Sequence, residues 1–266
     1  MPDTAVLTKR SFDEAKAALA PVVATAPIEI TIVGDIDENA AISAVASSFG
    51  ALPTRKLSGS FSPDARRAAF RTDRSPILLT HDGPTDKAMV ESVWPTTDDS
   101  NYREVIGVEL LKDVLDVMLT DNVRETLGDS YGVSLQSAMS DAFPGFGYLS
   151  AAAVVAPDKI EEVQKAISDA AAQLRDKTVG EDLLARARNP ELDKADRQLR
   201  DNSYWLTALE KAQSEPDRLD RIRRKKALLQ SLTAADIQKL AQKYLLPERV
   251  QKVQIVNNKV ATTASR

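Results

Sequence analysis

The stretch that decides the fold is VRETLGDSYGVS, residues 123–134, where a long helical pattern gives way to a strand pattern. Before it, apolar residues recur at helical spacing over residues 102–126, and after it an alternating pattern covers residues 131–140. Gly128 is a typical helix stop. The junction therefore places Arg124 at a helix end and Tyr131 at a strand start, seven residues apart.

Further elements surround this junction. Strands are predicted over residues 76–81, 87–94, 146–155 and 250–256. Long helices are predicted over residues 158–178, where Asp158 is the expected N-cap, and through most of residues 179–246. Because strands and long helices do not alternate strictly, we expect an α+β fold with a mostly antiparallel sheet packed against long helices.

The first fifty or so residues predict only part of a domain. A strand over residues 28–33 and a helix over residues 38–49 are expected, with no neighbouring strand in view. A lone strand cannot satisfy its backbone groups. We therefore predict the tail of an upstream domain over residues 1–52, a linker over 53–74, a complete domain over 75–258 and a disordered tail over 259–266.

Composition excludes several classes of function. A net charge of −4 and an aromatic share of 5% argue against a nucleic-acid partner. No apolar run is long enough to span a bilayer, so no membrane span is expected. The N-terminus has no basic start followed by an apolar core, so no signal peptide is expected. The absence of cysteine removes disulfides, thiolate metal sites and cysteine nucleophiles.

Metal-dependent hydrolysis has little support in these residues. The chain has one histidine, His81, so neither H-x-x-E-H nor H-E-x-x-H is present. A site made only of carboxylates stays open, although no spacing singles one out. We therefore assign no catalytic residue and no metal ligand to this chain, and interpret His81 as a strand-end residue.

Three other patterns have simpler explanations. Residues 128–132 match G-x-S-x-G around Ser130, but a nucleophile elbow needs a strand before the serine and a helix after it, the reverse of the order here. The acids at residues 35–39 lack the glycine and glutamate of an EF-hand and suit a helix start. The basic run at residues 221–226 is interpreted as a solvated helix face in preference to a site for an acidic partner or nucleic acid.

Arg124 and Tyr131 are the candidate binding residues. Separately each has an ordinary explanation, since a basic residue suits a helix C-terminus and a tyrosine suits a strand. Together, a planar fork of donors and a hydroxyl can bind peptide carbonyl oxygens or a developing oxyanion.

The phrase Arg-Glu-x-x-Gly-x-x-Tyr at residues 124–131 resembles the helix-to-strand corner in the non-catalytic half of M16 (insulinase/pitrilysin-type) zinc peptidases. PIEITIVGDID at 27–37 and FGALP at 49–53 resemble the family's last strand of one domain and the end of its interdomain helix. NSYWL at 202–206 resembles a helical segment of long bacterial members. In order and spacing, the likeness covers most of residues 25–257.

The resemblance implies two homologous halves, each of two α+β domains, that close around an unfolded peptide. Zinc and the catalytic glutamate would belong to the other half, so Zn is expected there and not in this chain. Arg124 and Tyr131 would bind substrate. The implied partner is a zinc-bearing half, in the same longer chain or as a separate subunit, and the isolated chain would be inactive.

An alternative is a non-enzymatic assembly or scaffold subunit, because inactive M16-like subunits also serve as structural parts of larger complexes. Long bacterial relatives are often exported, so the bacterial periplasm is the expected compartment, with the cytoplasm as the alternative.

Overall fold

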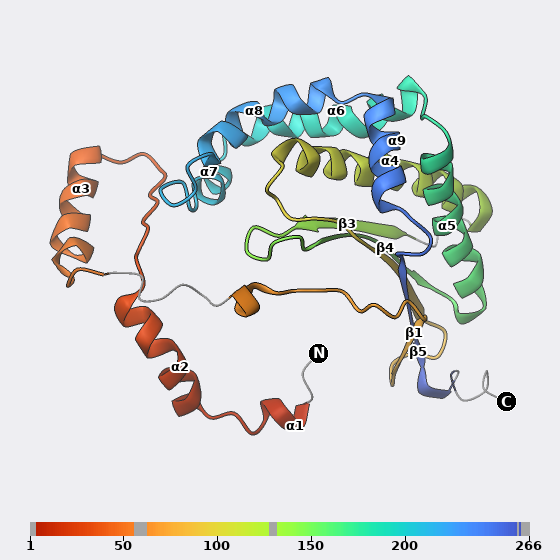
Figure 1. Cartoon of the computed structure of the whole chain (residues 1–266), viewed down its shortest axis with the longest axis horizontal. Helices are drawn as coiled ribbons and strands as arrows, with labels where there is room; N and C mark the ends of the chain where they lie inside the picture. Colours follow the sequence, from red (N-terminus) through yellow and green to blue (C-terminus); the bar gives the residue numbers. More distant parts are fainter. Residues whose placement is uncertain (1–3, 56–62, 128–131, 260, 262–266) are drawn as a thin grey trace. The chain divides into compact units, whose positions relative to one another are not determined.

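A computed structural model describes residues 4–55, 63–127, 132–259 and 261, with no side-chain description for residues 63 and 123–127 (Figure 1). Its contacts divide the chain into two compact units. One consists of residues 1–65 with 199–220, and the other of residues 66–198 with 221–266. The second unit contains the sheet and both elements of the junction.

The second unit is built on a five-stranded sheet in the order β1-β5-β2-β4-β3. Its strands are β1 (Ile77–His81), β2 (Ala88–Pro95), β3 (Val133–Met139), β4 (Gly147–Val155) and β5 (Gln251–Asn257). Only β1 and β5 pair in parallel, and the other neighbours are antiparallel. The mostly antiparallel α+β sheet expected from the sequence is therefore confirmed.

Helices cover one face of this sheet (Figure 1). They are α4 (Tyr102–Leu127), α5 (Ile160–Asp176), α6 (Glu181–Gln198), α8 (Arg218–Ser231) and α9 (Ala234–Tyr244). The first three residues of α8 belong to the other unit. The 3-10 turn η3 (Pro157–Lys159) precedes α5, and the 3-10 turn η2 (Pro63–Arg66) spans the boundary between the two units in the chain. Because η3 forms the turn at Asp158, α5 begins at Ile160 and the predicted N-cap role of Asp158 is wrong.

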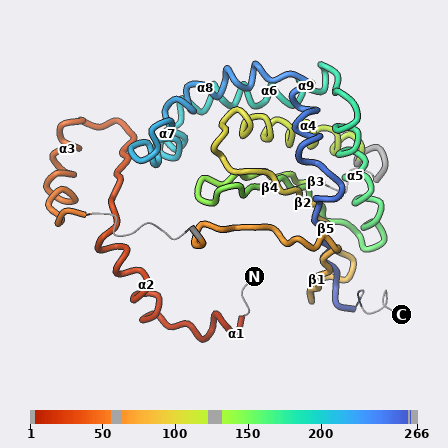
Figure 2. Tube along the Cα trace, in the orientation of Figure 1, coloured from red at the N-terminus to blue at the C-terminus, as the bar shows by residue number. Residues whose placement is uncertain are grey.

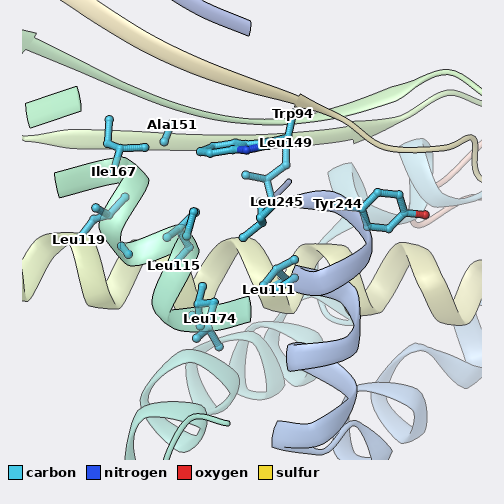
Figure 3. Packing of buried hydrophobic residues seen from close by; sticks show 14 of the residues in the cluster. Trp94, Leu111, Leu115, Leu119, Leu149, Ala151, Ile167, Leu174, Tyr244 and Leu245 are labelled. Carbon is cyan, nitrogen blue, oxygen red and sulfur yellow. The ribbon is translucent and has the colours of Figure 1, made fainter. Parts of the chain in front are cut away.

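The core lies between the sheet and the helices. Leu111, Leu115 and Leu119 recur along one side of α4 and are fully buried. Figure 3 shows these side chains gathered with Trp94 and Leu149 from the sheet. Burying a leucine contributes about 1.5–3 kcal/mol relative to exposure, so this repeating apolar stripe fixes α4 on the sheet. The position of the helix-to-strand junction follows from that packing.

The first unit contains no strand among its described residues. Its elements are α1 (Thr4–Leu7), α2 (Phe12–Thr25), α3 (Glu38–Ser47), η1 (Phe49–Ala51) and α7 (Asn202–Ala208). The strand predicted over residues 28–33 is wrong for this chain alone, since no strand among the described residues pairs with the segment. β-branched residues favour extended backbone, but a strand also needs a neighbour.

Residues distant in sequence bind the segment over residues 28–33. The carboxylate of Glu29 accepts hydrogen bonds from the Gln213 backbone N–H (2.6 Å) and the Ser214 hydroxyl (2.9 Å). Figure 2 shows the segment passing beside α7. Residues 199–220 thus group with the N-terminal residues, which the predicted bounds did not include. Residues 56–62 of the predicted linker and residues 260 and 262–266 of the predicted tail lie outside the described residues.

Candidate functional site

The predicted corner lies between α4 and β3. Arg124 is in the last turn of α4, which ends at Leu127, and β3 begins at Val133. The helix before the corner and the strand after it are confirmed. Tyr131 lies outside the described residues, and the Arg124 side chain is not described. The joint role of these two residues therefore stays a prediction.

The strand that leaves this corner is the last in the sheet. β3 pairs with β4 on one side, and no described strand pairs with its other side. The Ser140 N–H donates to Phe146 O at 2.9 Å, toward β4. Because backbone groups alternate in direction along a strand, the even-numbered residues of β3 continue this ladder. The outward N–H and C=O groups are those of Val133, Leu135, Ser137 and Met139.

A pocket of about 400 Å³ is lined by residues of β3, of β4 and of three helices. Leu135 and Ser137 line it from the helix-covered face of β3, whereas Gln136 and Tyr148 belong to the opposite face by the alternation of the strands. The pocket therefore involves both of the last two strands of the sheet, β3 and β4.

Six charged side chains form the rest of the pocket wall. They come from α4, α6 and α8 and comprise Glu109, Lys112, Asp113, Glu191, Lys194 and Lys225. Each lysine has a carboxylate partner: Lys112 with Asp113 at 2.5 Å, Lys194 with Glu191 at 3.4 Å and Lys225 with Glu109 at 3.6 Å. The wall thus carries three charges of each sign and suits a polar occupant, whether it is positively or negatively charged.

Burial affects the charges nearest the sheet. Burial raises the pKa of Asp113, although the hydrogen bond and charge of Lys112 oppose that shift. For Lys112 burial alone would lower the pKa, but the hydrogen bond and charge of Asp113 outweigh it and the pKa is raised. Burial likewise raises the pKa of the neighbouring Asp116. Lys112 and Asp113 are therefore a pair held away from bulk water, which strengthens their influence on an occupant.

The described residues do not fit a zinc site. Within them no three His, Cys, Asp or Glu side chains are grouped so as to hold a metal ion. His81 is engaged in the turn after β1, where the Gly83 N–H donates to its Nδ1 at 2.9 Å and its Nε2 donates to Lys87 O at 3.2 Å. The same part of the chain contains no helix with the length and hydropathy needed to cross a membrane.

Two other charged patterns have structural roles. The Ala40 N–H donates to the Asp37 carboxylate at 2.7 Å, so this acid caps α3 as a helix-start residue should. In the basic run of α8, Arg221 pairs with Asp99 at 2.6 Å and Lys226 with Asp196 at 2.6 Å. Part of that run therefore forms ion pairs within its own unit, whereas the sequence predicted only a solvated helix face.

Comparison with known families decides the classification. The family described as the peptidase M16 inactive domain matches residues 25–190, more than half of the chain. The chain belongs to the M16 peptidase family. The family membership that the resemblance predicted is thereby confirmed, and the mostly antiparallel sheet with long helices is an inactive M16 domain. No curated protein matches the chain by sequence.

Solved structures show the same fold. The periplasmic protease PqqL from Escherichia coli is 16% identical, with a TM-score of 0.65 over 85% of this chain and 25% of that one. The peptidase M16 inactive domain from Pseudomonas fluorescens is 18% identical, with a TM-score of 0.63 over 85% and 52%. A chain of complex III2 from Candida albicans is 12% identical, with a TM-score of 0.62 over 84% and 53%. This M16 chain thus spans about a quarter to half of each.

The pocket beside β3 was not found from the sequence. Its charged residues lie on three helices, separated by many tens of residues, and none forms a motif. The sequence did contain one signal. Charged residues and prolines often protect an edge strand from pairing with other chains, and the β3 stretch VSLQSAM has neither.

Proposed function

We propose that this chain is the non-catalytic, substrate-holding part of an M16-type zinc metallopeptidase that degrades peptides. The observation that carries the proposal is the match to the inactive M16 domain, in a chain whose single histidine cannot supply H-x-x-E-H. The free edge of β3, which starts two residues after Tyr131, supports a role in holding an extended peptide.

The catalytic metal would belong to a zinc-bearing M16 half. That half is either another part of a longer chain or a separate subunit, and the greater length of the solved relatives is compatible with both. Zinc would polarise the scissile carbonyl and activate water there. Arg124 and Tyr131 would bind and orient the peptide backbone from this side.

The domain organisation is part of this proposal. Residues 1–52 would be the tail of an upstream M16-like domain, and residues 75–258 a complete one. An apolar groove of about 760 Å³ within the first unit supports the first assignment. It is lined by Ile32 and Ile42, which are 48% and 58% exposed, and an upstream sheet would cover such residues. The periplasm is the proposed compartment, because the structurally similar PqqL is a periplasmic protease.

Substitution in the assembled enzyme tests the proposed role. Arg124→Ala and Tyr131→Phe should each lower peptide turnover about tenfold or more, because each removes a donor to the substrate backbone. Zinc content should stay unchanged. Arg186→Ala is the matched control, since this arginine lies exposed on α6 and pairs with Asp121. Normal turnover in both test variants would refute the substrate-holding role.

A non-enzymatic assembly subunit is the second candidate. The likeness to a chain of complex III2 favours it, because that chain has the same fold within a large complex. An obligate partner that lacks H-x-x-E-H, in a complex without peptidase activity, would support this function over the first.

A further inference from the structure

The pocket lined by β3, β4 and three helices contains one close ion pair, the inner pair. Lys112 Nζ and Asp113 Oδ1 lie 2.5 Å apart, and their side chains are 26% and 15% exposed. Oppositely charged groups that share a hydrogen bond usually lie about 2.7–2.9 Å apart. The inner pair is therefore in direct contact and forms a fixed part of the pocket wall.

The two other ion pairs of this wall, the outer pairs, are looser. Lys194 Nζ lies 3.4 Å from Glu191 Oε1, and Lys225 Nζ lies 3.6 Å from Glu109 Oε2. The four side chains are 61%, 25%, 27% and 42% exposed in that order. Long, partly exposed ion pairs contribute little to stability, so a charged ligand can replace these contacts without unfolding the wall.

Three uncharged polar side chains in the same pocket are available to a ligand. They belong to Gln136, Ser137 and Tyr148, and among the residues that the structure describes they form no side-chain hydrogen bond. An amide and two hydroxyls can both donate and accept hydrogen bonds. The pocket therefore combines uncommitted polar groups with loosely paired charges of both signs.

We propose that this pocket binds a small zwitterion, a molecule with one ammonium and one carboxylate group, of the size of a polar amino acid or a dipeptide. The ammonium lies between Glu109 and Glu191, and the carboxylate lies between Lys194 and Lys225. All lining residues belong to the second unit, so the site needs no other chain and the inference is independent of the proposed peptidase function.

Other classes of ligand fit this pocket less well. An anion would face three carboxylates and a cation would face three ammonium groups, and like charges repel. An apolar molecule would remove water from the charges without replacing its hydrogen bonds. A zwitterion has no net charge, so it leaves no charge of the wall unpaired. The volume of about 400 Å³ lies within the usual range for small-molecule pockets, about 300–1,000 Å³.

Three forms of one amino acid test the charge requirement on the 266-residue chain. L-glutamine carries both charges, N-acetylglutamine lacks the ammonium, and glutamine amide lacks the carboxylate. In titrations followed by NMR, glutamine should bind about threefold more tightly than either of the others, because each of them loses one partly exposed ion pair. The difference should shrink as salt is added.

A second titration distinguishes an amino acid from a dipeptide as the ligand. The dipeptide Ala-Gln carries the same two charges further apart, and its N-acetylated form is the control. Whichever of glutamine and Ala-Gln binds more tightly identifies the class of ligand. If neither binds, or if each binds no more tightly than its singly charged form, the proposal is wrong.

Two substitutions test the assignment of each charge. Glu191→Gln should weaken glutamine binding about threefold but should not weaken binding of N-acetylglutamine, which has no ammonium. Lys225→Met should weaken glutamine binding about as much but should not weaken binding of glutamine amide. Arg186→Ala is the control, because this arginine pairs with Asp121 and does not line the pocket. Weaker binding of all three ligands to both variants would contradict the assignment.

The same NMR spectra locate the ligand on the unsubstituted chain. Glutamine should shift the amide signals of residues 135–137 and of Glu191 most. The signals of β1 and β5, which lie at the other end of the strand order, should change little. Circular dichroism checks that both pocket variants are folded. Shifts that leave residues 135–137 unchanged would overturn the proposed site.

Discussion

Replacing Tyr244 by phenylalanine should lower the free energy of unfolding by about 1.5 kcal/mol at pH 7. Tyr244 is 2% exposed, and its hydroxyl donates to Glu104 Oε1 at 2.6 Å. Lys243 Nζ donates to the same oxygen at 2.5 Å. Hydrogen bonds to charged groups contribute about 1.5–3 kcal/mol, and we take the lower limit because Lys243 still holds the carboxylate after the substitution.

The loss of stability caused by Tyr244→Phe should depend on pH, because Glu104 titrates. Burial alone would raise the pKa of Glu104, but the hydrogen bonds from Lys243 and Tyr244 outweigh it and the pKa lies below its usual 4.5. The stability from this carboxylate is therefore complete above pH 4.5 and is lost as the pH falls through the lower pKa of the folded state. Burial raises the pKa of Tyr244 to about 12, so its hydroxyl remains a donor throughout. Tyr244→Phe should consequently cost less in acid than at pH 7.

Urea unfolding monitored by tryptophan fluorescence measures this cost. A Trp205→Phe background leaves Trp94 as the reporter, and Trp94 is buried in the same core as Tyr244. In a second background, Glu104→Gln, the cost of Tyr244→Phe should fall below about 1 kcal/mol and lose its pH dependence. An equal cost at both pH values and in both backgrounds would show that only packing is lost.

Two further substitutions test the packing and the helix start. Gly147→Ala should destabilise the second unit by about 3 kcal/mol, because an added Cβ would overlap the Thr97 carbonyl oxygen, whereas Gly180→Ala enters open space and should change stability by less than about 1 kcal/mol in urea unfolding. Thr233→Ala should cost about 1 kcal/mol by the same measurement, because the Thr233 hydroxyl accepts from the Asp236 N–H at 3.2 Å in a capping box, and an unchanged midpoint would contradict that role.

Local patterns predicted much of the fold. The apolar spacing before the corner became the buried stripe of α4, and the strand predicted over residues 87–94 became β2. Each of these features depends on residues close in sequence, which is why sequence reasoning found them.

The failures depend on partners distant in sequence. Residues 28–33 have strand composition, but whether a strand forms is decided by a neighbour that is absent among the described residues. The pocket beside β3 combines Asp113, Glu191 and Lys225 from three helices. No local sequence pattern predicts that these three side chains lie close together, because their proximity results from the packing of α6 and α8 over α4.

The candidate site was predicted in part. The helix and strand that flank the corner formed as expected, because a 3.6-residue period in the sequence gives way to a two-residue period between them. The roles of Arg124 and Tyr131 came from family resemblance, and they stay predictions. That β3 is an edge strand follows from the topology of the sheet alone.

The central claim is that this chain holds substrate for a zinc-bearing M16 half. The most direct test is to capture the native polypeptide from its cells with an antibody and to sequence by mass spectrometry the chain that contains or accompanies it. We predict a longer chain or a stable partner that carries H-x-x-E-H and cleaves peptides. A free chain, or one in complexes without that motif and without peptidase activity, would contradict the account.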